Sequence, residues 1–381
     1  MILFLILFSV VAAKPILVIE FIRHGARSPL KKDPFFPYDN WPLYGELTPA
    51  GERQLYLLGR LRRSQYIEEK DLLPNIYDPS LIYARSSDIR RTMMSLQSYL
   101  LGLYPTGLSK LNNNQIDKSK DFLLPKLALE IDPKVIEGLK DNPNPHSIPV
   151  HHFEIVNSTK DHMLLFSDCP ISEATNEKYM KDKYNEIFDK YMSIWKSLTE
   201  QYKNITMEEL KKGMDALNLC DFLLCADSDN VRPSHVTDKV LEQCAKLKGE
   251  IQADRVAYDE KCIKASTKPF AIEIIDWMQK AIKKETEVRY VVYGAHDVTL
   301  SRLLVGLKKM DSKIKWDSVP PFAANILFEL DENEKVKVLF NEELIHNSDY
   351  KDFKMKFEEV GDVNVTYADA CRAPTNLRFT K

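Results

Sequence analysis

The stretch ILVIEFIRHGARSP, residues 16–29, decides the predicted fold. Its first seven residues are almost all apolar and do not alternate with polar ones, which is typical of a strand buried on both faces of an α/β sheet. The run ends in Arg23-His24-Gly25, and Arg27 follows two residues after the glycine. Strands usually end in turns of Gly, Asn or Asp, so two guanidiniums and an imidazole at this point indicate a binding site.

Two more strands are predicted to end in polar clusters. The segment SLIYARSSD predicts a short strand followed by Arg85-Ser86-Ser87-Asp88. The segment EVRYVVYGAHD predicts a buried strand over 288–293 that is followed by His296-Asp297. Because ligands of α/β sheets bind beyond the carboxyl ends of the strands, we expect the three clusters to meet at one edge of the sheet.

Helices are predicted around these strands. Thr48 is a suitable N-cap for a helix that starts at Pro49, and Ser87 or Asp88 can cap the helix after the second cluster. Segments 177–202 and 236–250 are also predicted to be helical, and another helix leads from Ile272 toward the last buried strand. Segments 325–330 and 336–344 predict two antiparallel strands, and a last short helix follows them.

This order of elements predicts an α/β fold, with a mixed, mainly parallel sheet flanked by helices and a smaller helical domain inserted. The expected boundaries are residues 14–140 and 266–381 for the α/β domain and residues 141–265 for the insertion. The chain of 381 residues is long enough for this arrangement. Its net charge of −3 argues against a protein that binds nucleic acid through positive charge.

The N-terminal residues indicate the secretory pathway. Residues 1–13, MILFLILFSVVAA, are apolar and too short to span a bilayer, which takes about 20 residues. Val11 and Ala13 are small residues where a signal-peptidase site requires them, so we expect a signal peptide over residues 1–13. A buried N-terminal strand is the alternative, although residues 15–22 already supply the first strand.

Further features fit an oxidising compartment. The six cysteines are an even number that can pair completely. Three N-glycosylation acceptor triplets are present, at Asn157, Asn204 and Asn364. The C-terminal segment has neither a transmembrane run nor a lipid-anchor tail. The sequence therefore predicts a soluble protein without a membrane anchor, either secreted or lysosomal/lumenal.

The three clusters suit phosphoryl transfer. A transferring phosphoryl group carries charge on several oxygens, and the planar fork of an arginine can donate hydrogen bonds to two of them. A neutral imidazole such as that of His24 can attack phosphorus, and Asp297 can donate a proton to the leaving alkoxide. Gly25 would allow a close backbone approach and an unusual φ angle.

These motifs resemble those of the histidine acid phosphatases. RHGARSP fits the RHGxRxP signature of that family, AHDVTL fits its downstream His-Asp motif, and ARSSDIRRTMMS is similar to its second arginine segment. The segments GELTPAG, IPVHHFEI, PPFAANILFEL and YADACRA resemble stretches of the lysosomal and prostatic type. The resemblance extends from Ile16 to Cys371 and implies an α/β domain with a smaller helical domain.

The resemblance implies a role for each site residue. His24 is the nucleophile that forms a phosphohistidine, and Asp297 protonates the leaving group. The residues expected to bind the phosphoryl oxygens are Arg23, Arg27, Arg85 and His296. Arg90 and Arg91, on the following helix, are interpreted as solvated or structural. No metal or organic cofactor is implied, the expected partners are phosphomonoester substrates, and homodimers are common among animal-type members.

The cysteines depart from the family pattern. The resemblance implies a disulfide between Cys169 and Cys371. Animal relatives have a cysteine after the Pro-Pro-aromatic segment, where this chain has Ala323-Ala324. We therefore expect the remaining cysteines to pair among themselves; they are Cys220, Cys225, Cys244 and Cys262.

The predicted function is a secreted or lysosomal-type acid phosphatase that hydrolyses phosphate monoesters through a phosphohistidine. A phytase-like enzyme is a narrower alternative, but such enzymes often have Asn after His-Asp, where this chain has Val298. A secreted protein that binds phosphorylated ligands without catalysis is an alternative from another class, against which both His24 and Asp297 argue. A metal-dependent phosphohydrolase is disfavoured, because no histidine lies at helical ligand spacing from His296.

Overall fold

The computed structural model of the protein describes residues 13–32, 41–105, 151–201, 206–211, 215–234 and 236–373. The predicted signal peptide, apart from its last residue, lies outside these ranges. So do the acceptor site at Asn204 and the expected boundary between residues 140 and 141.

A seven-stranded sheet forms the centre of the described structure, in the order β3-β2-β4-β1-β5-β6-β7. The strands are β1 (Pro15–Arg23), β2 (Ile82–Ser87), β3 (Glu154–Val156), β4 (Tyr290–Ala295), β5 (Asn325–Asp331), β6 (Lys335–Phe340) and β7 (Glu343–Asp349). The strands from β3 to β1 pair in parallel, whereas β5, β6 and β7 pair antiparallel with their neighbours. The predicted mixed α/β sheet is confirmed, and its parallel half contains the three strands that end in polar clusters.

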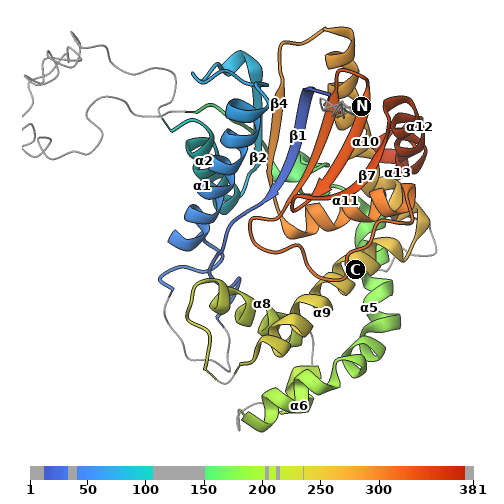
Figure 1. Ribbon diagram of the computed structural model, residues 1–381. Coiled ribbons are helices and arrows are strands. Elements are labelled where there is room, and N and C mark those ends of the chain that lie inside the picture. Colours follow the sequence, from blue (N-terminus) through green and yellow to red (C-terminus); the bar gives the residue numbers. More distant parts are fainter. Residues whose placement is uncertain are drawn as a thin grey trace, which may run out of the picture.

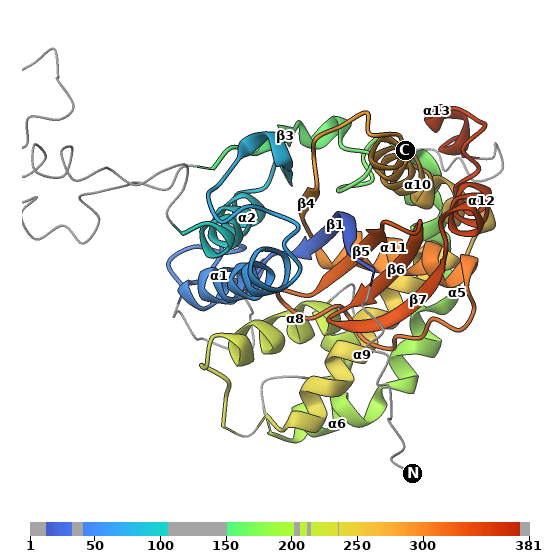
Figure 2. The same ribbon diagram turned by 45° about the horizontal axis from the view of Figure 1, so that its top comes forward.

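Helices cover both faces of the sheet (Figure 1, Figure 2). One face is covered by α1 (Pro49–Arg63) and α2 (Arg90–Leu103), and the other by α10 (Glu260–Lys283), α11 (Asp297–Met310) and α12 (Tyr350–Gly361). In β1, Val18 and Ile22 pack toward the first layer, and Ile19 and Phe21 pack toward the second. Both faces of this strand are therefore buried, which explains why all but one of residues 16–22 are apolar.

Further helices extend the molecule at one end of the sheet. The remaining elements are a π-helical turn (Ser64–Glu69), 3₁₀ turns (Pro79–Leu81 and Ser158–Lys160), α5 (Pro170–Lys190), α6 (Met192–Gln201), α7 (Met207–Lys211), α8 (Asp215–Ser228), α9 (Asp238–Ala257) and α13 (Tyr367–Ala370). Residues of α5 to α9 share a hydrophobic cluster that includes Trp195, Leu219 and Leu247. In Figure 1, α6, α8 and α9 lie below the sheet, beyond the carboxyl ends of its parallel strands.

Local sequence explains where several helices begin and end. Thr48 caps α1 as predicted, because its hydroxyl accepts a hydrogen bond from the amide of Gly51 at 3.3 Å. The single helix predicted over 177–202 is wrong, since the chain forms α5 and α6 with a break at Tyr191. At this break the indole N–H of Trp195 donates to the carbonyl of Phe188 at 3.0 Å, which satisfies an acceptor in the last turn of α5.

The strand predicted over 336–344 is interrupted by a tight turn. β6 ends at Phe340, β7 begins at Glu343, and the two residues between them, Asn341 and Glu342, have φ angles of 48° and 70°. Two residues in the left-handed region form the type of hairpin turn that matches strand twist. Asn341 is the sequence signal for this turn, because asparagine tolerates that region better than most residues.

Two disulfides connect parts of the described chain. One joins Cys169 to Cys371, the pair that the resemblance implies, and the other joins Cys220 in α8 to Cys244 in α9. The expectation of further pairing was wrong for the remaining two cysteines, Cys225 and Cys262, which are buried thiols. The Cys225 sulfur instead lies 3.3 Å from Nη1 of Arg27.

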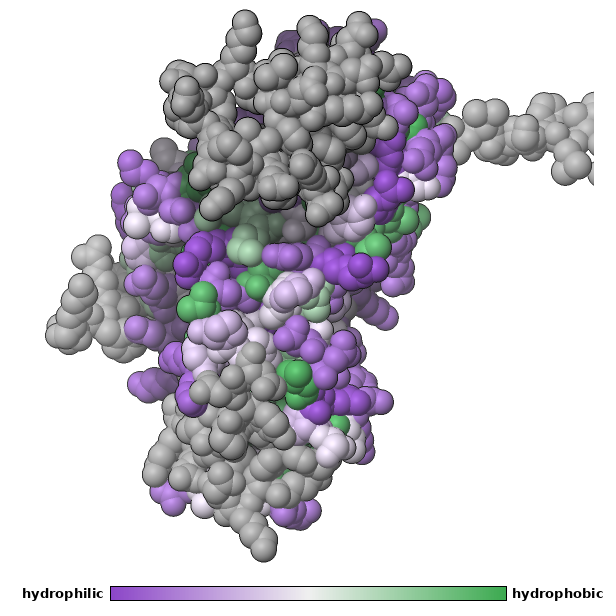
Figure 3. All heavy atoms as spheres, turned by 90° about the vertical axis from the view of Figure 1, so that its left-hand side faces the viewer, coloured by the Kyte–Doolittle hydropathy of each residue, from purple (hydrophilic) through white to green (hydrophobic). Residues whose placement is uncertain are grey.

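On the side of the molecule that Figure 3 shows, the coloured surface is mostly hydrophilic, with apolar residues scattered among polar ones. Leu57 and Leu61 of α1 are exposed, but scattered apolar residues are normal on a protein surface. The acceptor residues Asn157 and Asn364 are exposed. Within the described ranges, no helix combines the length and the apolar character that a bilayer crossing requires.

Candidate active site

The parallel pairing of β1 and β4 brings the first and third polar clusters together. Arg23 lies opposite Ala295, and the amide of His24 donates to the carbonyl of Ala295 at 3.0 Å. His24 and His296 therefore leave adjacent strands at the same level, and their ring centroids are 5.6 Å apart. Both residues are buried. The two motifs, more than 250 residues apart in the sequence, thus form one site.

The His24 ring is held as a neutral imidazole with one nitrogen left open. Its Nδ1 lies 2.9 Å from the carbonyl of Gly25, so Nδ1 carries the proton and donates it to that oxygen. Among the described residues, none makes a hydrogen bond to Nε2. Burial, followed by the positive charges of Arg23 and Arg27, lowers the pKa of His24 well below 6.5. The unprotonated Nε2 is the nucleophilic atom of such a ring.

Gly25 is needed for a close backbone contact. A Cβ atom at Gly25 would lie 2.3 Å from the carbonyl oxygen of Gly51, at the start of α1. A Cβ atom at Gly51 would in turn lie 2.1 Å from the carbonyl oxygen of Ala26. The expected close approach is confirmed, but the expected unusual φ is wrong, because Gly25 does not adopt the left-handed conformation. The contact fixes the loop after β1 against α1.

Arg23 connects the strand end to Asp297 and to the segment before β5. Its Nη2 donates to Oδ2 of Asp297 at 3.2 Å, and its Nη1 donates to the carbonyl of Pro320 at 2.6 Å. The ring of Phe322 lies over this guanidinium, with its centroid 4.1 Å from Cζ. Burial would raise the pKa of Asp297, but Arg23, then Lys248 and His24, lower it well below 3.8. In this state Asp297 is an ionised carboxylate.

Arg27 is bound from the opposite side by α8. Its Nη1 and Nη2 donate to the two carboxylate oxygens of Asp221 at 3.0 Å and 2.8 Å, and Nη1 also donates to the carbonyl of Ser28. Asp221 accepts a further hydrogen bond from Lys248 of α9. A bidentate pair of this kind fixes the plane of the guanidinium.

His296 is held by the ends of β2 and α2. Its Nε2 lies 2.9 Å from the hydroxyl of Ser87, and its Nδ1 lies 3.4 Å from Nη2 of Arg91. Burial and the Arg91 charge lower the pKa of His296 to about 3, so the ring is neutral. The predicted N-cap at Ser87 or Asp88 is wrong: α2 follows Ile89, which supplies no side-chain cap, and the Ser87 hydroxyl faces His296 instead.

Arg91, which we had interpreted as solvated or structural, belongs to the cluster. Burial and the like charge of Arg27 lower its pKa to about 10, which indicates crowding of guanidiniums. Arg85, which was expected here, instead donates to the buried carboxylate of Asp161 at 2.7 Å. Both arginines lie in the second motif, and α2 begins between them. The first turn of that helix is what directs Arg91 toward His296, a placement that the motif alone did not indicate.

The three arginines of the cluster share unfilled hydrogen-bonding capacity. The Nη groups of Arg23, Arg27 and Arg91 have protein partners, but the buried Nε of each has none among the described residues. Nε of Arg85 is also unpartnered, although that arginine is bound to Asp161. Buried N–H donors without acceptors are costly. The three arginines that carry these donors all lower the pKa of His24 by their charge, so the cluster suits an anion with several oxygens.

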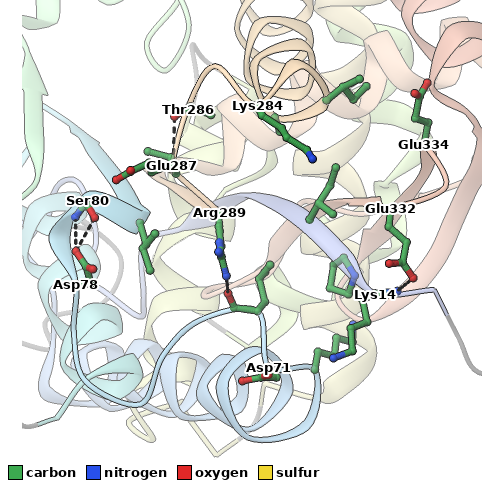
Figure 4. Close-up of a pocket in the computed structure, with 18 residues that line it drawn as sticks. Lys14, Asp71, Asp78, Ser80, Lys284, Thr286, Glu287, Arg289, Glu332 and Glu334 are labelled. Carbon is green, nitrogen blue, oxygen red and sulfur yellow. Dashed lines mark hydrogen bonds between the residues drawn. The ribbon is translucent and has the colours of Figure 1, made fainter.

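A large pocket in the described structure lies apart from the site around His24 and His296. It has a volume of about 890 Å³ and lies at the start of β1, where Lys14 is one of its lining residues (Figure 4). Strand β1 runs from this pocket to His24, so the two sites are at opposite ends of the strand. Figure 4 labels both acidic and basic side chains around the pocket, including Lys284, Arg289 and Glu334. It contains none of the residues predicted from the motifs.

Comparison with protein families decides the classification. The family model described as the histidine phosphatase superfamily (branch 2) matches residues 16–341. The chain belongs to the histidine phosphatase superfamily. The match includes both motifs that β1 and β4 bring together.

Relatives within this superfamily are distant. The chain is 25% identical to the lysosomal acid phosphatase of Rattus norvegicus over 319 residues, a match that covers 81% of this chain and 65% of the rat protein. It is 26% identical to the prostatic acid phosphatase of the same species, over 81% of this chain and 72% of that protein. The chain therefore spans less than two thirds of the length of the lysosomal relative.

A solved structure with a similar fold is that of a phytase. The apo form of a phytase from Hafnia alvei superposes with a TM-score of 0.62, over 95% of this chain and 98% of the phytase. Only 15% of the aligned residues are identical, so the likeness concerns the fold. The histidine phosphatase fold of this chain thus comprises the mixed sheet, its two helical layers and the helices beyond the strand ends.

Proposed function

We propose that this histidine phosphatase is an acid phosphatase that hydrolyses phosphate monoesters through a phosphohistidine at His24. The observation that carries the proposal is the neutral His24 ring, whose open Nε2 lies within a cluster of arginines with unpartnered buried donors. Such a site attracts a phosphate group and presents a nucleophile to it.

In the first step, Nε2 of His24 forms a bond to phosphorus while the bond from phosphorus to the leaving oxygen breaks. The Nδ1 hydrogen bond to the Gly25 carbonyl stabilises the positive charge that develops on the ring. Arg23, Arg27 and Arg91 donate to the phosphoryl oxygens, and Asp297 gives its proton to the leaving alkoxide. In the second step, Asp297 takes a proton from water, which displaces His24 and yields inorganic phosphate.

The acid requirement follows from the state of Asp297. In the free protein this carboxylate is ionised and paired with Arg23 at 3.2 Å. A bound phosphate dianion competes for Arg23 and places negative charge near Asp297, and both effects raise the pKa of the carboxyl group. Low pH then favours the protonated acid, whereas the lowered pKa of His24 keeps the nucleophile neutral. Activity should therefore be highest on the acid side of neutrality.

The secretory location is part of the proposal. The disulfide between Cys169 and Cys371 suits an oxidising compartment, and the acceptor residues Asn157 and Asn364 are accessible for glycosylation. The acid phosphatases most similar in sequence include lysosomal and prostatic enzymes. We assign Asn157 and Asn364 as glycosylation sites and the protein to the secretory pathway, with secretion and lysosomal delivery as its two destinations.

The test is hydrolysis of p-nitrophenyl phosphate between about pH 3 and pH 8, in the presence of EDTA, by the wild-type protein and by His24→Ala. Acid-side activity that survives EDTA and is lost in a folded His24→Ala variant supports the proposal. Activity on inositol hexakisphosphate alone would favour a phytase. Phosphate binding without any hydrolysis would favour a binding protein.

A further inference from the structure

Within the cluster of arginines, Arg27 is the one whose guanidinium is bound by α8, a helix beyond the strand ends. Asp221 and Cys225 of α8 are four residues apart, so they lie on one face of the helix, and both contact Nη1 of Arg27. Asp221 is 7% exposed and Arg27 is 3% exposed. This ion pair is therefore shielded from water and well fixed, unlike a surface pair.

The geometry of the pair leaves one edge of Arg27 open. Asp221 occupies the end of the guanidinium, because its two oxygens accept from Nη1 and Nη2. The side edge, formed by Nε and the second hydrogen of Nη2, remains, and Nε has no partner among the described residues. This edge is itself a two-donor fork that fits two oxygens of a phosphate. Asp221 thus selects which edge of Arg27 is available.

Lys248 supplies the counter-charge. A lone Asp221 carboxylate would place a negative charge one guanidinium away from the bound phosphate and repel it. Lys248 of α9 donates to Oδ1 of Asp221, and 12% of its side chain is exposed. With this lysine, the pair of Asp221 and Lys248 is neutral in sum.

The position of α9 relative to the site is fixed by a backbone contact. The amide of Val319 donates to the carbonyl of Ala245 in α9 at 2.9 Å. A Cβ atom at Gly249 would lie 2.3 Å from the backbone of Ser318, so the helix and this segment touch directly. Pro320, which follows Val319, accepts the hydrogen bond from Arg23 with its carbonyl oxygen. Lys248 is therefore anchored to the same segment that supports the other side of the site.

We infer that Asp221 and Lys248 are positioning residues for the phosphatase reaction: Asp221 orients the side edge of Arg27 toward the phosphoryl group, and Lys248 offsets the charge of Asp221. The inference rests on the proposed function for its substrate, a phosphate monoester. It assigns to α8 and α9 a part in phosphate binding that is exerted through Arg27, in addition to any part in substrate selection.

The experiment measures two quantities on the full chain: the Kd of inorganic phosphate by calorimetry, and kcat/KM for p-nitrophenyl phosphate. Asp221→Asn and Asp221→Glu are each expected to lower kcat/KM about tenfold, which corresponds to about 1.4 kcal/mol. The Glu variant keeps the negative charge but displaces the carboxylate from the guanidinium. A residue that acts through Arg27 has no effect once Arg27 is gone. Asp221→Glu, which keeps the charge, should therefore change kcat/KM less than about twofold in an Arg27→Ala background.

Lys248→Met is expected to raise the Kd of phosphate about tenfold, because the charge of Asp221 is then uncompensated. Lys246→Met is the matched control on the same helix: Lys246 pairs with Glu242 and Asp317 at the surface, and its loss should leave the Kd unchanged. The Glu variant of Asp221 also supplies a second protein should the Asn variant not fold.

The outcomes separate the inference from the proposed function. Equal losses from Asp221→Glu with and without Arg27 would overturn the positioning role, and an unchanged Kd in Lys248→Met would overturn the role of the lysine. A wild-type protein that binds phosphate but hydrolyses nothing would overturn the proposed function, while the Kd values would still decide the inference. A wild-type protein that does not bind phosphate would overturn both.

Discussion

Nη2 of Arg91 donates a hydrogen bond to Nδ1 of His296 at 3.4 Å, which ties the first turn of α2 to the residue after β4. Burial and the charge of Arg91 keep His296 neutral by lowering its pKa, and Arg91 is the third arginine whose charge also lowers the pKa of His24. The site thus depends on a helix that starts at the correct residue as well as on the two motif strands.

Arg91→Ala should therefore lower kcat/KM by about 10²- to 10³-fold, the loss expected when one donor to the developing charge is removed. The matched variant Arg85→Ala should retain kcat/KM within about threefold per folded molecule and lose stability instead, because it leaves the buried Asp161 without its ion-pair partner. Steady-state kinetics and urea unfolding of both variants check this. A larger kinetic loss in Arg85→Ala than in Arg91→Ala would show that our assignment of the two arginines is reversed.

Asp297→Asn removes the proton that the leaving group receives. Loss of a general acid costs about 10²- to 10⁴-fold when the leaving group is a poor one. We expect a loss of this size for an alkyl phosphate such as glycerol 2-phosphate, and a much smaller loss for p-nitrophenyl phosphate, whose leaving group needs little protonation. Equal losses for the two substrates would contradict the acid role of Asp297.

The free energy of unfolding should decrease as the pH is lowered, because of His296. Its pKa is about 3 in the folded protein and near the ordinary 6.5 in the unfolded chain. Between these values the unfolded chain binds a proton that the folded protein does not, so the free energy of unfolding decreases as the pH falls below about 6.5. His296→Gln should reduce this slope by up to about 1.4 kcal/mol per pH unit. Urea unfolding at several pH values measures it, and an unchanged slope would refute the assignment.

Glu20 forms a buried ion pair within the apolar strand β1. It is 0% exposed, its Oε1 accepts from Nε and Nη2 of Arg62, and its Oε2 accepts from the hydroxyls of Tyr99 and Tyr290. Glu20→Gln should destabilise the protein by about 3 kcal/mol, because the buried Arg62 guanidinium then keeps only Glu342, whose side chain is partly exposed, as a charged partner. The double variant Glu20→Met/Arg62→Met should recover much of that loss. If the loss of stability of the double variant, relative to the wild type, equals the sum of the losses in Glu20→Met and in Arg62→Met, the two residues are not coupled.

The parallel core and the meeting of the two motifs could be predicted from the sequence, because both depend on local signals. Unbroken apolar runs mark strands that are buried on both faces, and polar residues directly after them must lie at the edge of the sheet. Thr48 and Pro49 likewise mark the start of α1 by local chemistry.

The sequence is insufficient where side chains from distant parts of the chain decide the contacts. Arg85 and Arg91 are chemically alike and six residues apart, and only Asp161, from a segment far along the chain, distinguishes them. Asp221 was missed because a single aspartate within an amphipathic helix has no sequence signal for a contact with Arg27. The thiol of Cys225 stays unpaired for the same reason, since it packs against that arginine.

The central claim is that His24 carries the phosphoryl group during turnover. The most direct measurement is to mix the protein rapidly with a radiolabelled phosphate monoester, quench in alkaline detergent, where phosphohistidine is stable, and map the labelled peptide. We predict label on the peptide that contains His24, formed and lost at rates that account for kcat, and no label in the His24→Ala variant. Sustained hydrolysis without a labelled intermediate, or label on another residue, would contradict the account.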